Sequence, residues 1–360
     1  MSLALGMLVV LTTRWHGALS LDEDHGVQKL HAKPTPRIGG LPMFLGLVLG
    51  VSVSPRALQQ LLWPWLLASS PAFVLGLVED LTKCVGVQTR LLATLASGVL
   101  AWALMGYALR SVNVWGLDWL LQFTLAAVLF TAFSVAGLAN AINIVDGLNG
   151  LASSLVMWAL LGIAALSASL GDTVLAGACL LLAVCVLGFF VVNWPLGKLF
   201  LGDGGAYFLG FSLAWACVLL VERNDAVSAF AALLLCVHPI TEVLYSVYRR
   251  KVRHQHPGHP DRLHFHSLVN RRLMQRLLPQ SSKTVRNSAG GVLVGGLSVV
   301  PAVLVQFTYA STLLNGVWVV LMVGGYLWMY RFIVRRMVKM NTPCRAMGID
   351  PQATQESERF

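Results

Sequence analysis

Four polar side chains recur every three residues in the segment NAINIVDGLNG, residues 140–150, which follows a long apolar run: Asn140, Asn143, Asp146 and Asn149. On a helix this spacing forms a slowly drifting stripe that faces one neighbour. Gly147 and Gly150 then end the helix and let backbone amides approach a ligand closely. Amide side chains at such a place can coordinate a hard cation or hydrogen-bond a uracil-like edge. Helix–helix hydrogen bonding through asparagine is the alternative explanation.

A single carboxylate surrounded by glycines is the second candidate. In GKLFLGDGGAY, Asp203 stands between Gly202 and Gly204, directly before a predicted membrane span. Glycines leave the carboxylate oxygens accessible to a metal ion, and backbone N–H groups at a helix N-terminus can bind phosphate. An ordinary Asp-Gly turn is the alternative.

An acidic pair ends another predicted span, in GLVEDLTKCVGVQTRLL. Glu79 and Asp80 are adjacent, so their side chains point about 100° apart on a helix and are expected to have different roles. A helix C-terminus disfavours negative charge, which argues for a function, whereas a solvated helix end is the alternative. Arg90 follows at the start of the next span.

Two loops are rich in basic residues. The first, DEDHGVQKLHAKPTPRIGG, contains Lys29 and Arg37. Its alternative explanation is a loop without a site, whose positive charge only reflects the positive-inside rule. The second, RRKVRHQHPGHPDRLHFHSLVNRR, contains five histidines among many arginines. Zinc is a poor fit because no cysteine lies nearby and arginines repel a cation, so phosphate recognition is favoured. His238 and Glu242, four residues apart, are expected to pair with each other.

The elements that carry these residues are membrane helices. Hydrophobic residues make up 56% of the 360 residues and charged residues only 12%, against about 25% charged in soluble domains. The mean hydropathy is +0.70. We therefore predict an all-α, polytopic integral membrane protein with about eleven spans, each near the length needed to cross a bilayer. The predicted spans are residues 1–21, 38–54, 59–78, 91–109, 118–139, 150–170, 173–193, 205–221, 226–247, 288–309 and 313–333.

Positive charge sets the expected orientation. Of the 26 lysines and arginines, 22 fall in loops on one side of the predicted spans. Because such residues accumulate in cytoplasmic loops, we expect a periplasmic N-terminus, a cytoplasmic C-terminus and a cytoplasmic-face site. The net charge of +10 then reflects topology and anionic partners in the lipid bilayer, and no nucleic-acid partner is expected. We predict one domain over residues 1–339, a polar, disordered tail over 340–360, and no disulfide framework.

The order of these motifs resembles that of the polyprenyl-phosphate N-acetylhexosamine-1-phosphate transferases, membrane enzymes of glycosyl transferase family 4. The resemblance extends from Lys29 to about Arg272. It rests on K-L-H…P-x-P-R-x-G-G, the acidic pair, N-x-x-N-x-x-D-G-x-N-G, L-G-D-x-G and H-x-H. The family joins a sugar-1-phosphate from a UDP-sugar to a polyprenyl phosphate, releases UMP and requires magnesium.

The resemblance implies a role for each motif residue. It makes Asp203 the main ligand of Mg²⁺, with Mn²⁺ as an alternative ion, and Asn143 the second ligand. It implies that Asp80 and Glu79 handle the lipid phosphate, that Asp146 and Asn149 seat the uridine or position the nucleotide, and that Asn140 contributes to substrate binding. The implied contacts to phosphate and sugar are Lys29, Arg90, Arg262, His264 and His266.

Departures from the family pattern bear on the substrate. The acidic pair is Glu-Asp where many members have Asp-Asp, Ser267 follows the H-x-H motif where a third histidine is common, and the first loop lacks an Asn-x-Arg before Lys29. We therefore expect a bacterial inner-membrane enzyme that transfers an N-acetylhexosamine-1-phosphate to undecaprenyl phosphate and initiates O-antigen or capsule synthesis, and a homodimer is compatible with this expectation. The alternatives are a phospho-MurNAc-pentapeptide transferase of peptidoglycan synthesis and, from another class, a secondary transporter of an anionic solute.

Overall fold

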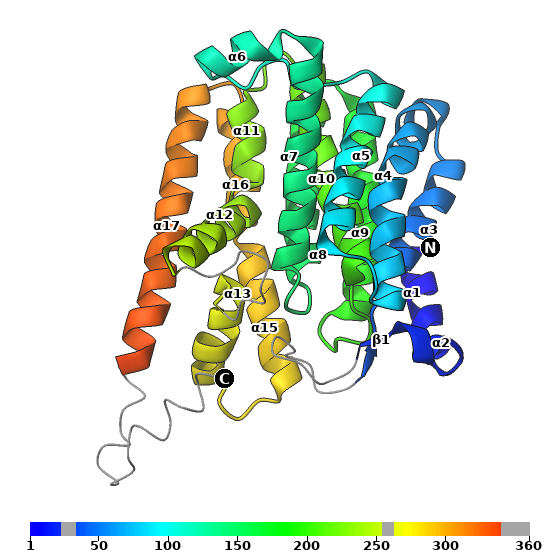
Figure 1. The fold of residues 1–360 in the computed structure, drawn as a ribbon, viewed down its shortest axis with the longest axis vertical. Coiled ribbons are helices and arrows are strands. Elements are labelled where there is room, and N and C mark those ends of the chain that lie inside the picture. Colours follow the sequence, from blue (N-terminus) through cyan, green and yellow to red (C-terminus); the bar gives the residue numbers. More distant parts are fainter. Residues whose placement is uncertain (23–33, 254–262, 340–360) are drawn as a thin grey trace.

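The computed structural model describes residues 1–22, 34–253 and 263–339, without the side chains of the last four. It is a bundle of roughly aligned helices (Figure 1). Within the described residues, eight helices are long and apolar enough to cross a membrane, or nine if one bent pair forms a single span. The all-α membrane class is therefore confirmed, whereas the predicted count of eleven spans is not.

The first half of the chain runs from α1 to α8. Its elements are α1 (Ser2–Leu11), α2 (Thr13–Ser20), β1 (Leu21–Asp22), β2 (Thr35–Pro36), α3 (Gly40–Ser52), α4 (Arg56–Thr82), α5 (Val87–Met105), α6 (Trp115–Leu121), α7 (Thr124–Val145) and α8 (Leu151–Ser169). The second half comprises α9 (Thr173–Asn193), α10 (Gly202–Arg223), α11 (Ala229–Leu235), α12 (Val237–Val252), α13 (Phe265–Leu268), the π-helix η1 (Val269–Met274), α14 (Gln275–Leu277), α15 (Lys283–Gly296), α16 (Val299–Thr308) and α17 (Thr312–Lys339).

Several predicted spans differ from the observed helices, including the tenth, residues 288–309, which is divided between α15 and α16. The first, residues 1–21, is divided into the short helices α1 and α2, and the second contains only the 13 residues of α3. The ninth, residues 226–247, is bent by 74° between α11 and α12. Pro239 lies in the first turn of α12 and has no N–H to continue the hydrogen-bond ladder of α11, which favours a break there. In Figure 1, α12 accordingly runs across the direction of the long helices.

Helix α10 forms the centre of the bundle. In its most apolar stretch 94% of the residues are buried, against 17% for α17, which has neighbours on one side only. It packs against α4 and α7 along most of its length and also contacts α3 and α8. Because burial on all sides excludes lipid and water, α10 holds whatever lies at its two ends in fixed positions.

Glycines allow α3 and α4 to contact the first turn of α10 directly. A Cβ atom on Gly76 of α4 would lie 2.6 Å from the Cα atom of Gly204, and one on Gly40 of α3 would overlap the backbone of Gly205. Real Cβ atoms do not approach this closely, so only glycine fits at these crossings. The start of α10 is therefore enclosed by backbone as well as by side chains.

A two-stranded sheet lies beside this helix start. Leu21 pairs with Pro36 and Asp22 with Thr35, in antiparallel register. The segment after β2 is bonded to the segment before α10, because Phe200 N–H donates to Pro36 O at 2.8 Å and Gly39 N–H donates to Phe200 O at 2.8 Å. These bonds place Arg37, which lies between the two, next to the first turn of α10.

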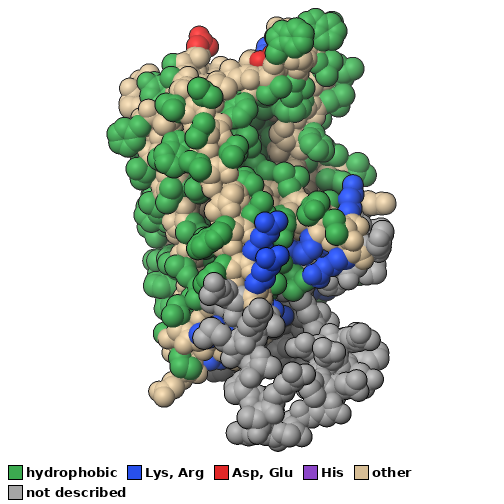
Figure 2. Space-filling model, turned by 90° about the vertical axis from the view of Figure 1, so that its left-hand side faces the viewer, with side chains coloured by type: hydrophobic (Ala, Val, Ile, Leu, Met, Phe, Trp, Pro, Cys, Tyr) green, Lys and Arg blue, Asp and Glu red, His purple; other side chains and the backbone are tan. Residues whose placement is uncertain are grey.

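Charge is unevenly distributed along the bundle. Hydrophobic side chains cover most of the face shown in Figure 2, and lysine and arginine side chains gather toward its lower end. The last turn of α12 contributes Arg249, Arg250 and Lys251 to the basic side chains of the protein. The sheet lies at this lower end in Figure 1, so the basic end is also the end that holds the start of α10.

Candidate active site

Asp80 and Asp203 meet at the start of α10. Asp80, in the last turn of α4, is 1% exposed. Its carboxylate accepts the N–H of Asp203 at 2.7 Å and the N–H of Gly204 at 2.9 Å. Asp80 therefore caps α10 from a different helix, and it occupies the backbone donors that the sequence offered as a phosphate site. Gly202, with φ +75°, leaves room for the carboxylate, because a Cβ atom there would collide with it.

Two arginines neutralise these carboxylates. Arg37 lies 3.3 Å from Asp80 through Nε and also donates a hydrogen bond to Asp203. Arg90, in the first turn of α5, donates to the other oxygen of Asp203. Asp203 is only 3% exposed, so both cations face a carboxylate that is largely removed from water. The result is a four-residue charged cluster, here called the acidic cluster, of Arg37, Asp80, Arg90 and Asp203.

The acidic cluster has oxygen donors that suit magnesium. Mg²⁺ is usually bound through one or two carboxylates together with phosphate oxygens of a substrate, and Asp203 with the neighbouring Asp80 supplies that kind of donor. Across residues 1–22, 34–253 and 263–339 no group of three His, Cys, Asp or Glu side chains is arranged to hold a metal. Further ligands would therefore come from other oxygen donors, such as amide side chains or substrate phosphates. Asn143, the predicted second ligand, lies half-buried in the last turn of α7, and its role stays a prediction.

Asp146 extends the acidic cluster toward the end of α7. It is the residue that ends this helix, and its side chain is half-buried. Burial raises the pKa of Asp146 to about 7, an effect that Arg37 opposes and that the charges of Asp203 and Asp80 reinforce. A carboxyl group with this pKa can exchange a proton near neutral pH.

The histidines of the H-x-H motif lie on the other side of the same turn. Gly147 is in contact with the His266 ring, since a Cβ atom on this glycine would overlap Nε2. The rings of His264 and His266 are stacked, with centroids 5.5 Å apart and planes within 3°. The path from the acidic cluster through Asp146 and Gly147 to the two histidines is therefore continuous, and residues far apart in the sequence converge at one end of the bundle.

Two other predicted residues, Glu79 and Asn140, have structural partners. Glu79 accepts the N–H of Val85 at 2.7 Å and so closes the turn between α4 and α5. Asn140 donates to Thr94 Oγ1 of α5 at 3.1 Å and to the carbonyl of Ala136 at 2.8 Å. This is the helix–helix contact that was the alternative explanation for the asparagines.

Asn149 lies in a buried polar network apart from the acidic cluster. Its N–H donates to Asn287 Oδ1 at 2.7 Å and its amide donates to Ser288 Oγ at 3.1 Å, both on α15. The next N–H, of Gly150, donates to Asn193 Oδ1 at 2.6 Å. Asn149 therefore joins the loop after α7 to α9 and α15, which fixes the position of Asp146.

Glu242 has a partner other than the predicted one. Its Oε1 atom lies 2.9 Å from His264 Nδ1, and among the described residues it has no recorded hydrogen bond to His238. The expected pairing of His238 with Glu242 is thus wrong, because the carboxylate of Glu242 is directed from α12 to His264 and to the Phe265 N–H at the start of α13. His238 instead packs edge-on against Phe265 and Tyr326.

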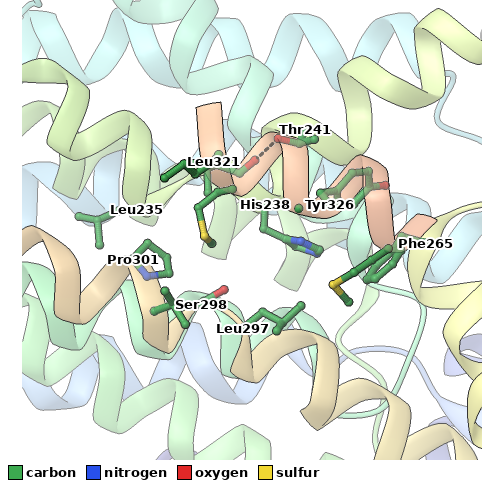
Figure 3. Close-up of a pocket in the computed structure, with 14 residues that line it drawn as sticks. Leu235, His238, Thr241, Phe265, Leu297, Ser298, Pro301, Leu321 and Tyr326 are labelled. Carbon is green, nitrogen blue, oxygen red and sulfur yellow. Dashed lines mark hydrogen bonds between the residues drawn. The ribbon is translucent and has the colours of Figure 1, made fainter. Parts of the chain in front are cut away.

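A cavity of about 170 Å³ lies beside these rings, between α12, α16 and α17. In Figure 3, His238 and Phe265 border it from one side, and Leu297 and Pro301 lie opposite. Its lining is mainly apolar, and it separates the aromatic side chains around Glu242 from α16.

Two predicted contacts, Lys29 and Arg262, fall outside the described residues. Sequence reasoning, in turn, gave Arg37 no specific role, although its place in P-x-P-R-x-G-G was a usable signal. It also missed Glu242 as a partner of the histidine motif, for which a lone carboxylate inside a predicted span was the only signal.

Comparison with known proteins agrees with this arrangement. Residues 62–221 match the family described as Glycosyl transferase family 4. A probable undecaprenyl-phosphate N-acetylglucosaminyl 1-phosphate transferase of Bacillus subtilis is 28% identical over 240 residues, 66% of each chain. A decaprenyl-phosphate N-acetylglucosaminephosphotransferase of Mycobacterium tuberculosis is 30% identical over 304 residues, 73% of this chain and 71% of the relative.

A more limited match is the phospho-N-acetylmuramoyl-pentapeptide-transferase of Clostridium perfringens, 32% identical over 153 residues, which covers 40% of this chain and 48% of the relative. The long match to the mycobacterial enzyme extends well beyond the matched family segment. By this similarity, and by the convergence of its motifs at one end of a helical membrane bundle, the chain belongs to the polyprenyl-phosphate N-acetylhexosamine-1-phosphate transferases of glycosyl transferase family 4.

Proposed function

We propose that this protein transfers an N-acetylhexosamine-1-phosphate group from a UDP-sugar to undecaprenyl phosphate and releases UMP. The observation that carries the proposal is the acidic cluster, in which two buried carboxylates and two arginines lie at the basic end of a membrane bundle, continuous with two stacked histidines. Two polyanions must meet in this reaction, and such a site supplies both cation ligands and positive charge. The names of the relatives make UDP-N-acetylglucosamine the first donor to test.

Asp203 would hold magnesium, with Asn143 as the further protein ligand. The ion would supply positive charge to the diphosphate of the donor and stabilise the charge that develops on UMP. Arg37 and Arg90 then have a second use, because guanidinium groups released from Asp203 can bind phosphate oxygens through paired hydrogen bonds.

Asp80 and Asp146 have different roles in the proposal. Asp80 holds the first turn of α10, and hence Asp203, in place through its two backbone hydrogen bonds. Asp146, whose pKa of about 7 suits proton exchange, would keep the acceptor phosphate deprotonated or hold the nucleotide. Glu79 stays a predicted contributor at the lipid phosphate.

The proposal is tested by measuring UMP release by the purified protein in detergent. UDP-N-acetylglucosamine is supplied with and without undecaprenyl phosphate, and with magnesium, manganese or a chelator. We expect UMP only when lipid and divalent ion are both present. Release of inorganic phosphate without UMP, or no reaction with any UDP-N-acetyl sugar, would reject the proposal.

The match to the clostridial enzyme gives a second candidate, transfer of phospho-N-acetylmuramoyl-pentapeptide. The same assay with UDP-N-acetylmuramoyl-pentapeptide separates the two. The proposed activity predicts that the pentapeptide donor gives less than about a tenth of the UMP obtained with the best UDP-N-acetylhexosamine.

We further propose that the product initiates an O-antigen or capsule-type polysaccharide at the bacterial inner membrane, with the site on the cytoplasmic face. The basic end of the bundle, which carries the acidic cluster, supports this orientation under the positive-inside rule. The test uses a reporter enzyme that is active only in the periplasm. The reporter should be inactive when it is fused after residue 339 and active when it is fused after α10.

A further inference from the structure

Glu242 is a buried carboxylate that the proposed reaction does not use directly. It lies on α12 and is 1% exposed. Three donors converge on it: His264 Nδ1 at 2.9 Å, the N–H of Phe265 at 3.1 Å and the hydroxyl of Tyr326 at 2.8 Å. An ionised carboxylate only accepts hydrogen bonds, so it suits three donors. With Glu242 ionised, Nδ1 of His264 is the donor of their hydrogen bond.

A second tyrosine of α17 holds the same segment. The Tyr330 hydroxyl donates to the carbonyl of Leu263 at 3.0 Å, directly before His264, and itself accepts a hydrogen bond from Arg249 at 2.9 Å. Tyr326 and Tyr330 are four residues apart and so lie on one face of α17. Glu242, Tyr326 and Tyr330, here called the carboxylate–tyrosine unit, thus bond the backbone on both sides of His264 as well as its ring.

This arrangement determines what His264 can do. With Nδ1 bonded to Glu242, only Nε2 is left in the ring to meet a ligand. In the neutral Nδ1–H form Nε2 is an acceptor, and it is a charged donor to phosphate only in a doubly protonated ring. A ring without the bond to Glu242 could adopt the other neutral tautomer, in which the roles of Nδ1 and Nε2 are exchanged.

We propose that the carboxylate–tyrosine unit is a positioning device for His264, which fixes the proton on Nδ1 and presents Nε2 to the donor substrate. The inference rests on the proposed function for the identity of the ligand, whereas the placement of the ring stands on the hydrogen bonds alone. It also gives α17 a part in the site, although this helix lies outside the matched family segment of residues 62–221.

Two substitutions at Glu242 provide the first half of the test. Glu242→Gln keeps the shape but offers one acceptor oxygen to three donors, whereas Glu242→Asp keeps the charge. We expect kcat and kcat/KM of Glu242→Gln to fall together by about 10–100-fold, with partial recovery in Glu242→Asp. Tyr326→Phe and Tyr330→Phe should each lose about 10-fold by the same reasoning. Tyr245→Phe is the matched control, because its ring packs 4.8 Å from that of Tyr330 but its hydroxyl has no recorded hydrogen bond among the described residues.

The second half reads the ring directly and does not depend on activity. The protein is labelled with ¹⁵N-histidine, and the His264 signals are identified by their loss in His264→Gln. We expect the wild type to show a protonated Nδ1 and Glu242→Gln to show a mixture of tautomers. Lost activity with an unchanged tautomer would overturn the proposal, because Glu242 would then be only structural.

A changed tautomer with activity within about twofold of the wild type would overturn it as well, since positioning would not matter to the reaction. Loss of activity together with loss of the Nδ1–H tautomer supports the proposal. A wild type that releases no UMP from any donor would reject the proposed function, while the ring-nitrogen signals would still decide the placement of His264.

Discussion

The two ends of α10 hold two ion-pair groups of very different construction. At its far end, Arg223 forms a paired contact with Asp172 at 2.7 Å through both Nε and Nη2, and the two charges balance one to one. At its first turn, Asp203 and Asp80 face Arg37 and Arg90 in a cluster of four charged side chains, with Asp146 nearby. The helix rises about 1.5 Å per residue, so the two groups lie roughly 30 Å apart.

The difference separates stability from function. The Asp172 carboxylate also accepts the N–H of Leu175, so it is the N-cap of α9 and already accepts three hydrogen bonds within the protein. Under the proposed function, in contrast, a metal ion would take the place of the arginines beside Asp203 in the acidic cluster, and the arginines would bind phosphate instead. We therefore expect substitutions in the acidic cluster to act on turnover, and those at Arg223 and Asp172 to act on stability alone.

The largest effect is expected for Asp203→Asn. The amide keeps the shape but loses the charge that a divalent ion requires, so UMP release should fall by at least about 10²–10³-fold with expression intact. Asp172→Asn at the other end of α10 is the matched control and should retain full activity. Comparable losses in the two variants would remove the contrast between the ends.

Asp80→Asn should act on both activity and stability. Asparagine has one acceptor oxygen where the carboxylate has two, which leaves either Asp203 N–H or Gly204 N–H unsatisfied in a buried place, at a cost of about 1–3 kcal/mol. Thermal inactivation in detergent should occur at lower temperature, and the surviving protein should have reduced kcat. A variant with normal inactivation temperature would show that the cap from α4 is dispensable.

Gly76→Ala sharpens the comparison by testing the packing of the first turn. The added methyl group would meet the backbone of Gly204, and such overpacking costs about 1–3 kcal/mol. Gly137→Ala in α7, where a Cβ meets nothing within 4 Å, is the control. It should be neutral or stabilising by up to about 1 kcal/mol. Equal inactivation temperatures for the two variants would contradict the close contact of α4 with α10.

The smallest effect is expected for the stability change in Asp172→Asn. Burial favours a higher pKa for Asp172, but hydrogen bonds from Arg223 and the Leu175 N–H outweigh it, so the pKa lies below the ordinary 3.8. A lowered pKa stabilises the folded state above the unfolded value, and this contribution disappears as pH falls through the folded value. The inactivation temperature should drop slightly at neutral pH, by the equivalent of about 0–1 kcal/mol, and match the wild type well below pH 3.8. A difference in inactivation temperature that persists well below pH 3.8 would show that the stability change does not come from the charge of the Asp172 carboxylate.

Much of the site could be predicted because its residues stand in glycine-rich or acidic motifs at the ends of apolar runs. Asp80 and Asp203 are of this kind, and the structure brings them together. The partner of Glu242 could not be predicted, because His264 lies 22 residues away beyond a loop and the local spacing favoured His238. Tyr326 and Tyr330 lie in a span whose composition gives no sign of a partner.

The spans show a similar limit. Hydropathy measures how apolar a segment is but not where its hydrogen-bond ladder is interrupted. It therefore merged α1 with α2 and α11 with α12. The proline that accompanies the second break was visible in the sequence, although a proline in a membrane helix does not by itself predict a bend of 74°.

The cap that Asp80 gives to α10 has a consequence for how the protein is made. Helix α4 leaves the ribosome long before α10, and until α10 arrives its last turn carries a carboxylate without the two N–H donors that compensate it. A charged residue near hydrocarbon is costly, so the end of α4 lacks its compensating partners until α10 is inserted. We therefore expect a chain that stops before residue 202 to be a substrate for quality-control proteolysis.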